Sequence, residues 1–208
     1  MFFTMLLAAA AIASCFLVVG GGATAWRLLW LAVGYCLLAS ILNLLPWLLG
    51  ATTILGQHYW WEFIAAVLFA PFVEETIKYY AAKSQTDRIH SFALVCLFGV
   101  AEFMLSKVLT MSHLYGYLGI IETLEAVPAL LLHVLTAIIY AFHLDGQRNK
   151  QLIVCLCIHS AFNSIVLLAP LHFALPITGV ALAIAIVFLR PWRDICRLGV
   201  WQDPQSDR

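Results

Sequence analysis

The sequence predicts an all-α membrane protein, a polytopic bundle of about seven transmembrane helices forming one integral membrane domain. Of its 208 residues, 63% are hydrophobic and only 11% are charged, and the mean hydropathy is +0.96. Soluble domains carry about 25% charged residues, so this composition excludes an ordinary soluble fold. The formal net charge is zero, and the basic residues form no stripe of the kind that binds nucleic acid.

Apolar runs near the length of a spanning helix, about 20 residues, divide the chain into segments with short connections. Gly20–Gly22 and Gly50 break the first two runs, and Pro170 and Pro176 bracket the last turn. We expect the first segment to be retained, because it lacks the basic region of a signal peptide. The predicted spans are Phe2–Val19, Arg27–Leu49, His58–Ala82, Ile89–Leu109, Val127–His143, Gln151–Leu168 and Ala174–Leu189.

Basic residues lie in every second connection, which predicts the orientation because such residues stay on the cytoplasmic side. Arg27, Lys83, Arg148 and Arg190 mark these connections. We therefore expect the N-terminus outside, the C-terminus inside, residues 191–208 as a cytoplasmic tail, and a multi-pass protein of the cell (inner) membrane.

Several polar residues interrupt the spans, although a charged group in a spanning helix costs about 2.5–3.5 kcal/mol. They are Glu74, Glu75 and Lys78 in the third span, Glu102 in the fourth, His133 in the fifth, and His159 and Asn163 in the sixth. At a rise of about 1.5 Å per residue, the two glutamates of the third span and the histidines of the fifth and sixth lie about 12–15 Å from the cytoplasmic span ends. The carboxyl of the fourth span lies about 21 Å from its end. Four helices thus bring ionisable groups to one depth.

Helical spacing adds detail to this cluster. Residues four apart share a face, so Glu74 lies over Lys78 and His159 over Asn163. Lys78 can neutralise one of the adjacent carboxylates, Glu74 or Glu75, and leave the other free to exchange a proton. Pro71 removes a backbone donor before this pair and can bend the helix.

These groups suit the activation of water by one of two mechanisms. A carboxylate can act as general base, while histidine and asparagine donate hydrogen bonds to a developing oxyanion. Alternatively, ligands drawn from His133, His159, Glu75 and Glu102 could hold zinc with an open position for water. The residues themselves leave both mechanisms open, so the expected cofactor is either none or zinc.

The same residues resemble, in order, the four motifs of the PrsW-type intramembrane proteases, relatives of the type II CAAX prenyl endopeptidases. The matching motifs are Glu74-Glu75-x-x-Lys78, Phe98-x-x-x-Glu102, an isolated His133 after Pro128, and His159-x-x-x-Asn163. The match covers residues 69–164, which we treat as a four-helix core.

The resemblance implies a peptidase that cleaves a membrane-anchored protein or peptide. It assigns Glu74 or Glu75 as the base, His133 and His159 as oxyanion donors or metal ligands, and an orienting or polarising role to Asn163. The CAAX enzymes carry E-E-x-x-x-R and F-x-x-x-H instead, so Lys78 and Glu102 argue against prenylated substrates.

Other functions use the same residues differently. Glutamate and histidine could form the proton relay of a small proton-coupled transporter. The cluster could also be a buried ion-pair network that only specifies packing, or belong to a non-catalytic protein that binds a membrane partner. The oligomeric state and the identity of any substrate stay open.

Overall fold

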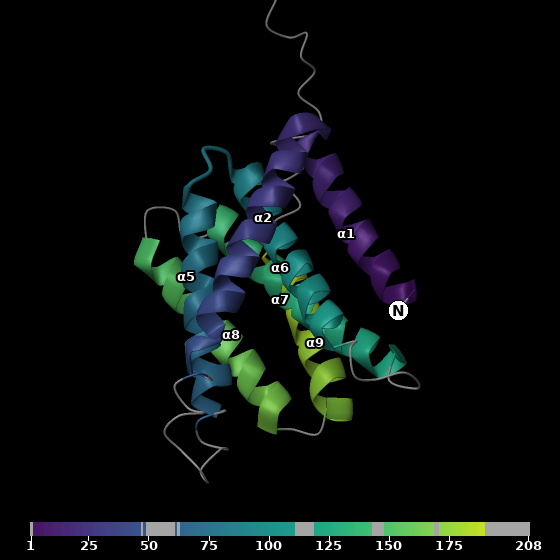
Figure 1. Ribbon diagram of the computed structural model, residues 1–208, viewed down its shortest axis with the longest axis vertical. Helices are drawn as coiled ribbons and strands as arrows, with labels where there is room; N and C mark the ends of the chain where they lie inside the picture. The colour runs from purple at the N-terminus through teal and green to yellow at the C-terminus, as the bar shows by residue number, and fades with distance from the viewer. Residues whose placement is uncertain are drawn as a thin grey trace, which may run out of the picture.

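The computed structural model describes residues 2–46, 48, 61, 63–110, 119–142, 148–168 and 171–189. Within these ranges the chain is helical with short turns and contains no strand, which confirms the predicted all-α class. Successive helices run in alternating directions (Figure 1). The elements are α1 (Phe2–Val19), α2 (Gly22–Asn43), the π-helix η1 (Ile64–Phe69), α5 (Ala70–Lys83), α6 (Arg88–Thr110), α7 (Gly119–Phe142), α8 (Arg148–Leu168) and α9 (Leu171–Phe188). The predicted tail, residues 191–208, lies outside the described residues.

Three stretches of the described chain are long and apolar enough to cross a membrane: Gly22–Asn43, Arg88–Leu105 and Asn149–Leu168. Shorter apolar stretches lie in α1, α7 and α9. Large apolar side chains also cover the outside of the bundle, with Leu17 and Phe188 each 78% exposed. Apolar surface on this scale marks an interaction surface, and lipid is the partner that these helices suit.

The turn between α1 and α2 follows the predicted glycine break. Gly20, Gly21 and Gly22 have φ angles of 81°, 71° and 71°, a left-handed conformation that glycine adopts without steric cost. The helix resumes directly after this turn, so α2 begins at Gly22 and not at Arg27 as predicted.

Other boundaries also differ from the prediction, since α2 ends at Asn43 and not at Leu49, and α8 begins at Arg148 and not at Gln151. Helix α7 begins at Gly119, well before Val127, and continues through Pro128. Helix α9 begins at Leu171, so Pro176 lies inside the helix and not in the preceding turn. Neighbouring helices and local adjustments make proline tolerable inside membrane helices, which explains why these prolines do not end their helices.

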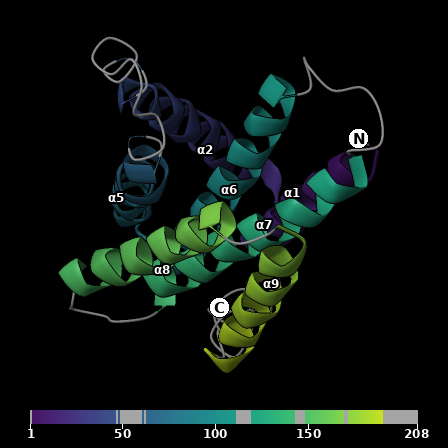
Figure 2. The same cartoon turned by 90° about the horizontal axis from the view of Figure 1, so that it is seen from below.

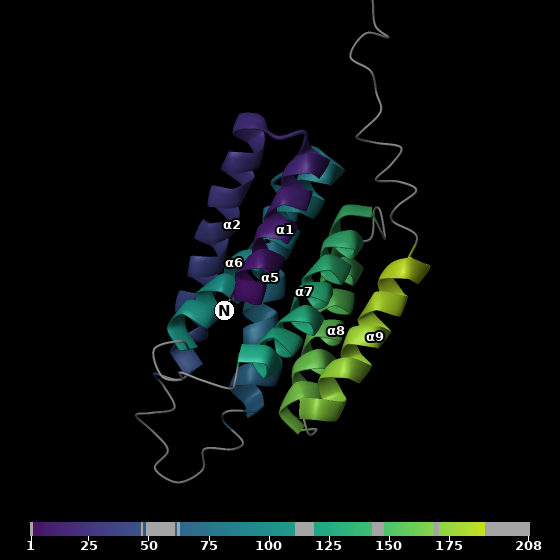
Figure 3. The same ribbon diagram turned by 90° about the vertical axis from the view of Figure 1, so that its right-hand side faces the viewer.

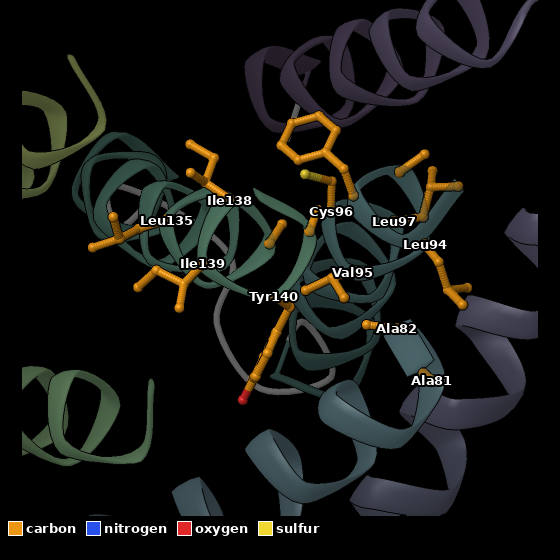
Figure 4. Close-up of a cluster of buried hydrophobic side chains, with 14 of the residues drawn as sticks. Ala81, Ala82, Leu94, Val95, Cys96, Leu97, Leu135, Ile138, Ile139 and Tyr140 are labelled. Atoms are coloured by element: carbon orange, nitrogen blue, oxygen red, sulfur yellow. The ribbon is translucent and has the colours of Figure 1, made fainter. Parts of the chain in front are cut away.

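The centre of the bundle is the contact between α6 and α7. In the Arg88–Leu105 stretch, 61% of the residues are buried, against 17% in the stretch of α8. A helix that is apolar on every side belongs in an interior. Figures 2 and 3 show α2 on one side of this pair and α8 and α9 on the other. Figure 4 shows Leu94, Val95, Ile138 and Ile139 of this core, with the Tyr140 hydroxyl pointing out of it.

Candidate active site

Glu75 occupies the centre of the polar cluster, where α5, α7 and α8 meet. Its Oε1 accepts hydrogen bonds from Lys78 Nζ and His159 Nδ1, both at 2.7 Å. Its Oε2 accepts one from the Tyr140 hydroxyl at 2.9 Å. The side chains of Glu75 and Lys78 are both 0% exposed. Both oxygens of Glu75 are therefore occupied by protein donors.

This arrangement sets the state of His159. A carboxylate paired with lysine is an acceptor, so His159 Nδ1 is the donor, and in a neutral ring Nε2 then carries a lone pair. The Nε2 atom faces Glu74 Oε2 at 3.6 Å. That oxygen is buried and has no hydrogen-bond partner among the described residues. With His159 neutral, two acceptors face each other at a separation too long for a direct bond.

The other oxygen of Glu74 is held by a residue outside the predicted core. Asn43, at the end of α2, donates its side-chain amide to Glu74 Oε1 at 3.0 Å. Sequence reasoning did not single out Asn43. The available signal was an amide within an otherwise apolar span.

Glu102 and His133 form the second half of the cluster. His133 Nε2 lies 3.4 Å from Glu102 Oε2, and the Glu102 side chain is 33% exposed. The two carboxyls, Glu102 and Glu74, also interact with each other. The His133 ring lies edge-on to His159, with centroids 6.2 Å apart. The structure therefore brings the three predicted carboxylates and both histidines into one cluster.

Phe98 forms a wall of this cluster. Its ring centroid lies 6.2 Å from that of His133 and 5.2 Å from Lys78 Nζ. A cation over an aromatic face is stabilised by the ring's electron density. Phe98 therefore holds both the lysine and the histidine in place.

Asn163 lies on the same face as His159, but the structure places its amide elsewhere. Asn163 Nδ2 donates to the backbone carbonyl of Ala66 at 2.8 Å. In the π-helix the Ala70 N–H bonds to Ala65 O, so the donor for Ala66 O in this register would come from Pro71, which has no N–H. The Asn163 amide supplies the missing donor and joins α8 to η1.

Tyr140 is a second residue that sequence reasoning missed. Its hydroxyl contacts Glu75 from α7, 65 positions away in the chain. In the sequence it reads as one aromatic residue within an apolar run, and only the tertiary contact shows its polar role. Tyrosine in an interior usually places its hydroxyl on a partner.

An apolar groove of about 390 Å³ lies between η1, α5 and α8. It is lined by Ile64, Leu68, Phe69, Phe72, Leu156 and Ser160. Ser160 directly follows His159 in the chain, and Phe72 precedes the two glutamates. No residue of the polar cluster is among the described residues that line this groove, but the same two helices, α5 and α8, contribute side chains to both.

Glu75, one of the predicted zinc ligands, is not free to bind a metal in this arrangement. Within the described ranges no three histidine, cysteine, aspartate or glutamate side chains are placed to hold a metal ion. Glu75 Oε1 is bonded to both Lys78 and His159 Nδ1, and zinc would have to displace these donors. We therefore derive no catalytic step through a metal.

Comparisons with known proteins returned no match: no protein-family model, no curated protein and no solved structure is similar to the chain. The functional assignment consequently depends on the chemistry of the cluster and on the motifs described above. Within the cluster, the pair most relevant to chemistry on water is Glu74 Oε2 and His159 Nε2, which lie 3.6 Å apart.

Proposed function

We propose that the chain is an intramembrane peptidase that hydrolyses a peptide bond by glutamate-activated water. The observation that carries this proposal is the pair of facing acceptors, Glu74 Oε2 and His159 Nε2, at 3.6 Å. A water that donates to both acceptors spans roughly 4.4 Å at ordinary hydrogen-bond lengths, so the two side chains have to separate slightly to admit it. A water that donates one O–H to each acceptor keeps its lone pairs free to attack a carbonyl carbon.

Glu74 is the general base in this proposal. Its Oε2 takes a proton from the water as the new carbon–oxygen bond forms, and then passes that proton to the leaving amine as the carbon–nitrogen bond breaks. The Asn43 hydrogen bond to Oε1 fixes the direction in which Oε2 points. A base within hydrogen-bonding reach of its proton typically contributes about 10²–10⁴-fold to a rate.

In this proposal Glu75 orients the His159 imidazole and does not activate water. Its three side-chain hydrogen bonds, from Lys78, His159 and Tyr140, leave it no oxygen for a reactant. A carboxylate on one nitrogen of an imidazole selects the tautomer and fixes the ring, as in other catalytic sites. Glu75 therefore keeps His159 Nε2 directed at the water.

His133 and Glu102 face the developing oxyanion. His133 Nε2 lies 3.4 Å from Glu102 Oε2, and its Nδ1 is buried with no hydrogen-bond partner among the described residues. A protonated His133 directs its Nε2–H at Glu102 and offers its Nδ1–H to the negative charge of the tetrahedral intermediate. Glu102 has the most exposed side chain of the three carboxylates, although its Oε2 atom is buried. Asn163 supports the site from a distance, through the Ala66 carbonyl.

The proposed substrate class is based on the resemblance to the PrsW-type proteases and on the apolar groove between η1, α5 and α8. The PrsW-type motifs point to a membrane-anchored protein or peptide, and an apolar segment in this groove would lie against the same two helices that carry Glu74 and His159. We further propose a multi-pass protein of the cell (inner) membrane, with the N-terminus outside and the C-terminus in the cytoplasm, on the basis of the basic connections.

The test is cleavage of single-span substrates by the purified protein in proteoliposomes, read by gel and mass spectrometry. Glu74→Gln and His159→Ala should each leave little or no detectable cleavage, whereas Asp87→Asn, at an exposed carboxylate, serves as the matched control. A chelator should not affect the rate. Wild-type cleavage in both site variants would refute the proposal, and loss of activity with chelator, restored by zinc, would replace the glutamate mechanism with a metal one.

A proton-coupled transporter is the second candidate, favoured by the partial exposure of Glu102 next to His133. Such a protein would move protons across the bilayer, which a pH-sensitive dye inside the same proteoliposomes reports. Proton flux without cleavage, lost in Glu102→Gln, would support this alternative.

A further inference from the structure

Gly99 lies on α6 between Phe98 and Glu102, facing α7 at the point where His133 enters the cluster. A Cβ atom placed on Gly99 would lie 2.4 Å from both Cβ and Cγ of His133 and 2.6 Å from its Cδ2. Real Cβ contacts are essentially never shorter than 3.0 Å. A side chain at this position is therefore incompatible with the present place of His133.

Rotation of the imidazole cannot relieve this clash. One clashing atom is the His133 Cβ, which is attached to the backbone, so α6 and α7 would have to separate. Ordinary contact begins at 3.4 Å against the 2.4 Å here, so the separation is about 1 Å. The surrounding contact is tight, since Ala93 and Ala137 are both 0% exposed, and close-packed interiors resist such shifts.

We infer that Gly99 is a positioning residue for His133: its missing side chain lets α7 approach closely enough to seat the imidazole between Phe98 and Glu102. The His133–Glu102 distance of 3.4 Å and the 6.2 Å ring contacts both depend on this approach. The effect on catalysis rests on the proposed function, whereas the steric dependence of His133 on Gly99 does not.

Other glycines in helices provide the contrast. A Cβ on Gly34, in α2, would meet nothing within 4 Å, and one on Gly179, in α9, would first meet Pro128 at 3.4 Å, an ordinary contact. Gly34→Ala is therefore the matched control, because it makes the same chemical change in a helix without a clash. It should leave folding and activity close to wild type, since alanine also favours helices over glycine.

The experiment is a stability cycle in detergent micelles with the variants Gly99→Ala, His133→Gly and the double variant. Gly99→Ala should lower the unfolding midpoint relative to wild type, but not when introduced into His133→Gly, because that background lacks the clashing atoms. Should Gly99→Ala fail to fold, the double variant is still expected to fold. An equal loss of stability in both backgrounds, or failure of both proteins to fold, would overturn the inference.

Two readouts separate positioning from a general packing effect. The ¹⁵N resonances of His133 should shift in Gly99→Ala and stay unchanged in Gly34→Ala. A misplacement of about 1 Å can cost about 10²-fold in rate, so kcat should fall about 10²-fold in Gly99→Ala with little change in KM. Unshifted His133 resonances would overturn the inference. If wild type cleaves nothing, the proposed function fails while the stability cycle and the resonances still decide the role of Gly99.

Discussion

Glu75 and Glu74 are adjacent in the chain, yet their glutamine variants should fail in different ways. Glu75→Gln removes the charge that compensates the Lys78 ammonium, and both of these side chains are 0% exposed. Breaking a buried ion pair from one side costs about 3–5 kcal/mol. Because Glu74 and Glu102 also interact electrostatically with Lys78, we expect a loss at the lower end, about 3 kcal/mol in the free energy of unfolding.

Glu74→Gln should leave stability close to wild type and reduce the reaction to little or no detectable cleavage. Glutamine keeps the shape of the side chain, and its oxygen can still accept the Asn43 hydrogen bond, which is 3.0 Å long in the wild-type chain. An amide cannot take the proton of water, so the cleavage rate should fall by about 10²–10⁴-fold, the usual contribution of a general base.

Both quantities can be measured on the same preparations, with unfolding followed by denaturant titration in mixed micelles and cleavage followed in proteoliposomes. The control is the double variant Glu75→Gln/Lys78→Met. Removing both charges should recover most of the stability without recovering activity, because His159 still lacks its carboxylate. A stable, inactive Glu75→Gln beside an active Glu74→Gln would exchange the two roles and refute the reasoning.

Three further substitutions test the supporting contacts. Asn43→Leu removes the amide that orients the reactive carboxylate, and the cleavage rate should fall about 10- to 100-fold, the value of one hydrogen bond to a charged group; an unchanged rate would contradict this role. Tyr140→Phe leaves Glu75 Oε2 without its hydroxyl donor and should lower the free energy of unfolding by about 1–3 kcal/mol, which the same titration would show or exclude. Asn163→Leu should speed hydrogen exchange of the backbone amides at 64–70, because the helix loses its tie to α8, whereas Ser164→Ala, which removes only a local hydrogen bond on the same helix, should not; equal exchange in the two variants would count against the proposed tie.

The meeting of the carboxylates and histidines could be predicted because it depends on quantities that the sequence contains. Helix rise and the basic residues at span ends give a depth for each side chain, and spacing by four gives a face. Glu74, Glu102, His133 and His159 could all be placed in this way. Their mutual distances could not, since these depend on how closely the helices pack.

The contacts that give each carboxylate its separate task were beyond prediction for the same reason. Tyr140 and Asn43 reach the glutamates from α7 and α2, across 65 and 31 positions of the chain, and no local pattern pairs them. Asn163 was correctly placed on the face of His159, but its bond to Ala66 depends on a π register that no residue pattern indicates. The importance of Gly99 depends on His133 Cβ, which lies opposite it on α7, and no sequence pattern indicates that contact.

The π-helix Ile64–Phe69 divides the third apolar segment into two rotational phases. A π turn bonds residue i to i+5 and so accommodates one residue more than an α turn. A helical wheel drawn continuously through this segment assigns the wrong face to everything on one side of it. Pro71 and the glutamates after it follow the α phase, so the face on which Phe63 lies is offset by about one residue, or roughly 100°, from the position that a continuous α-helix would give it relative to Glu74 and Glu75.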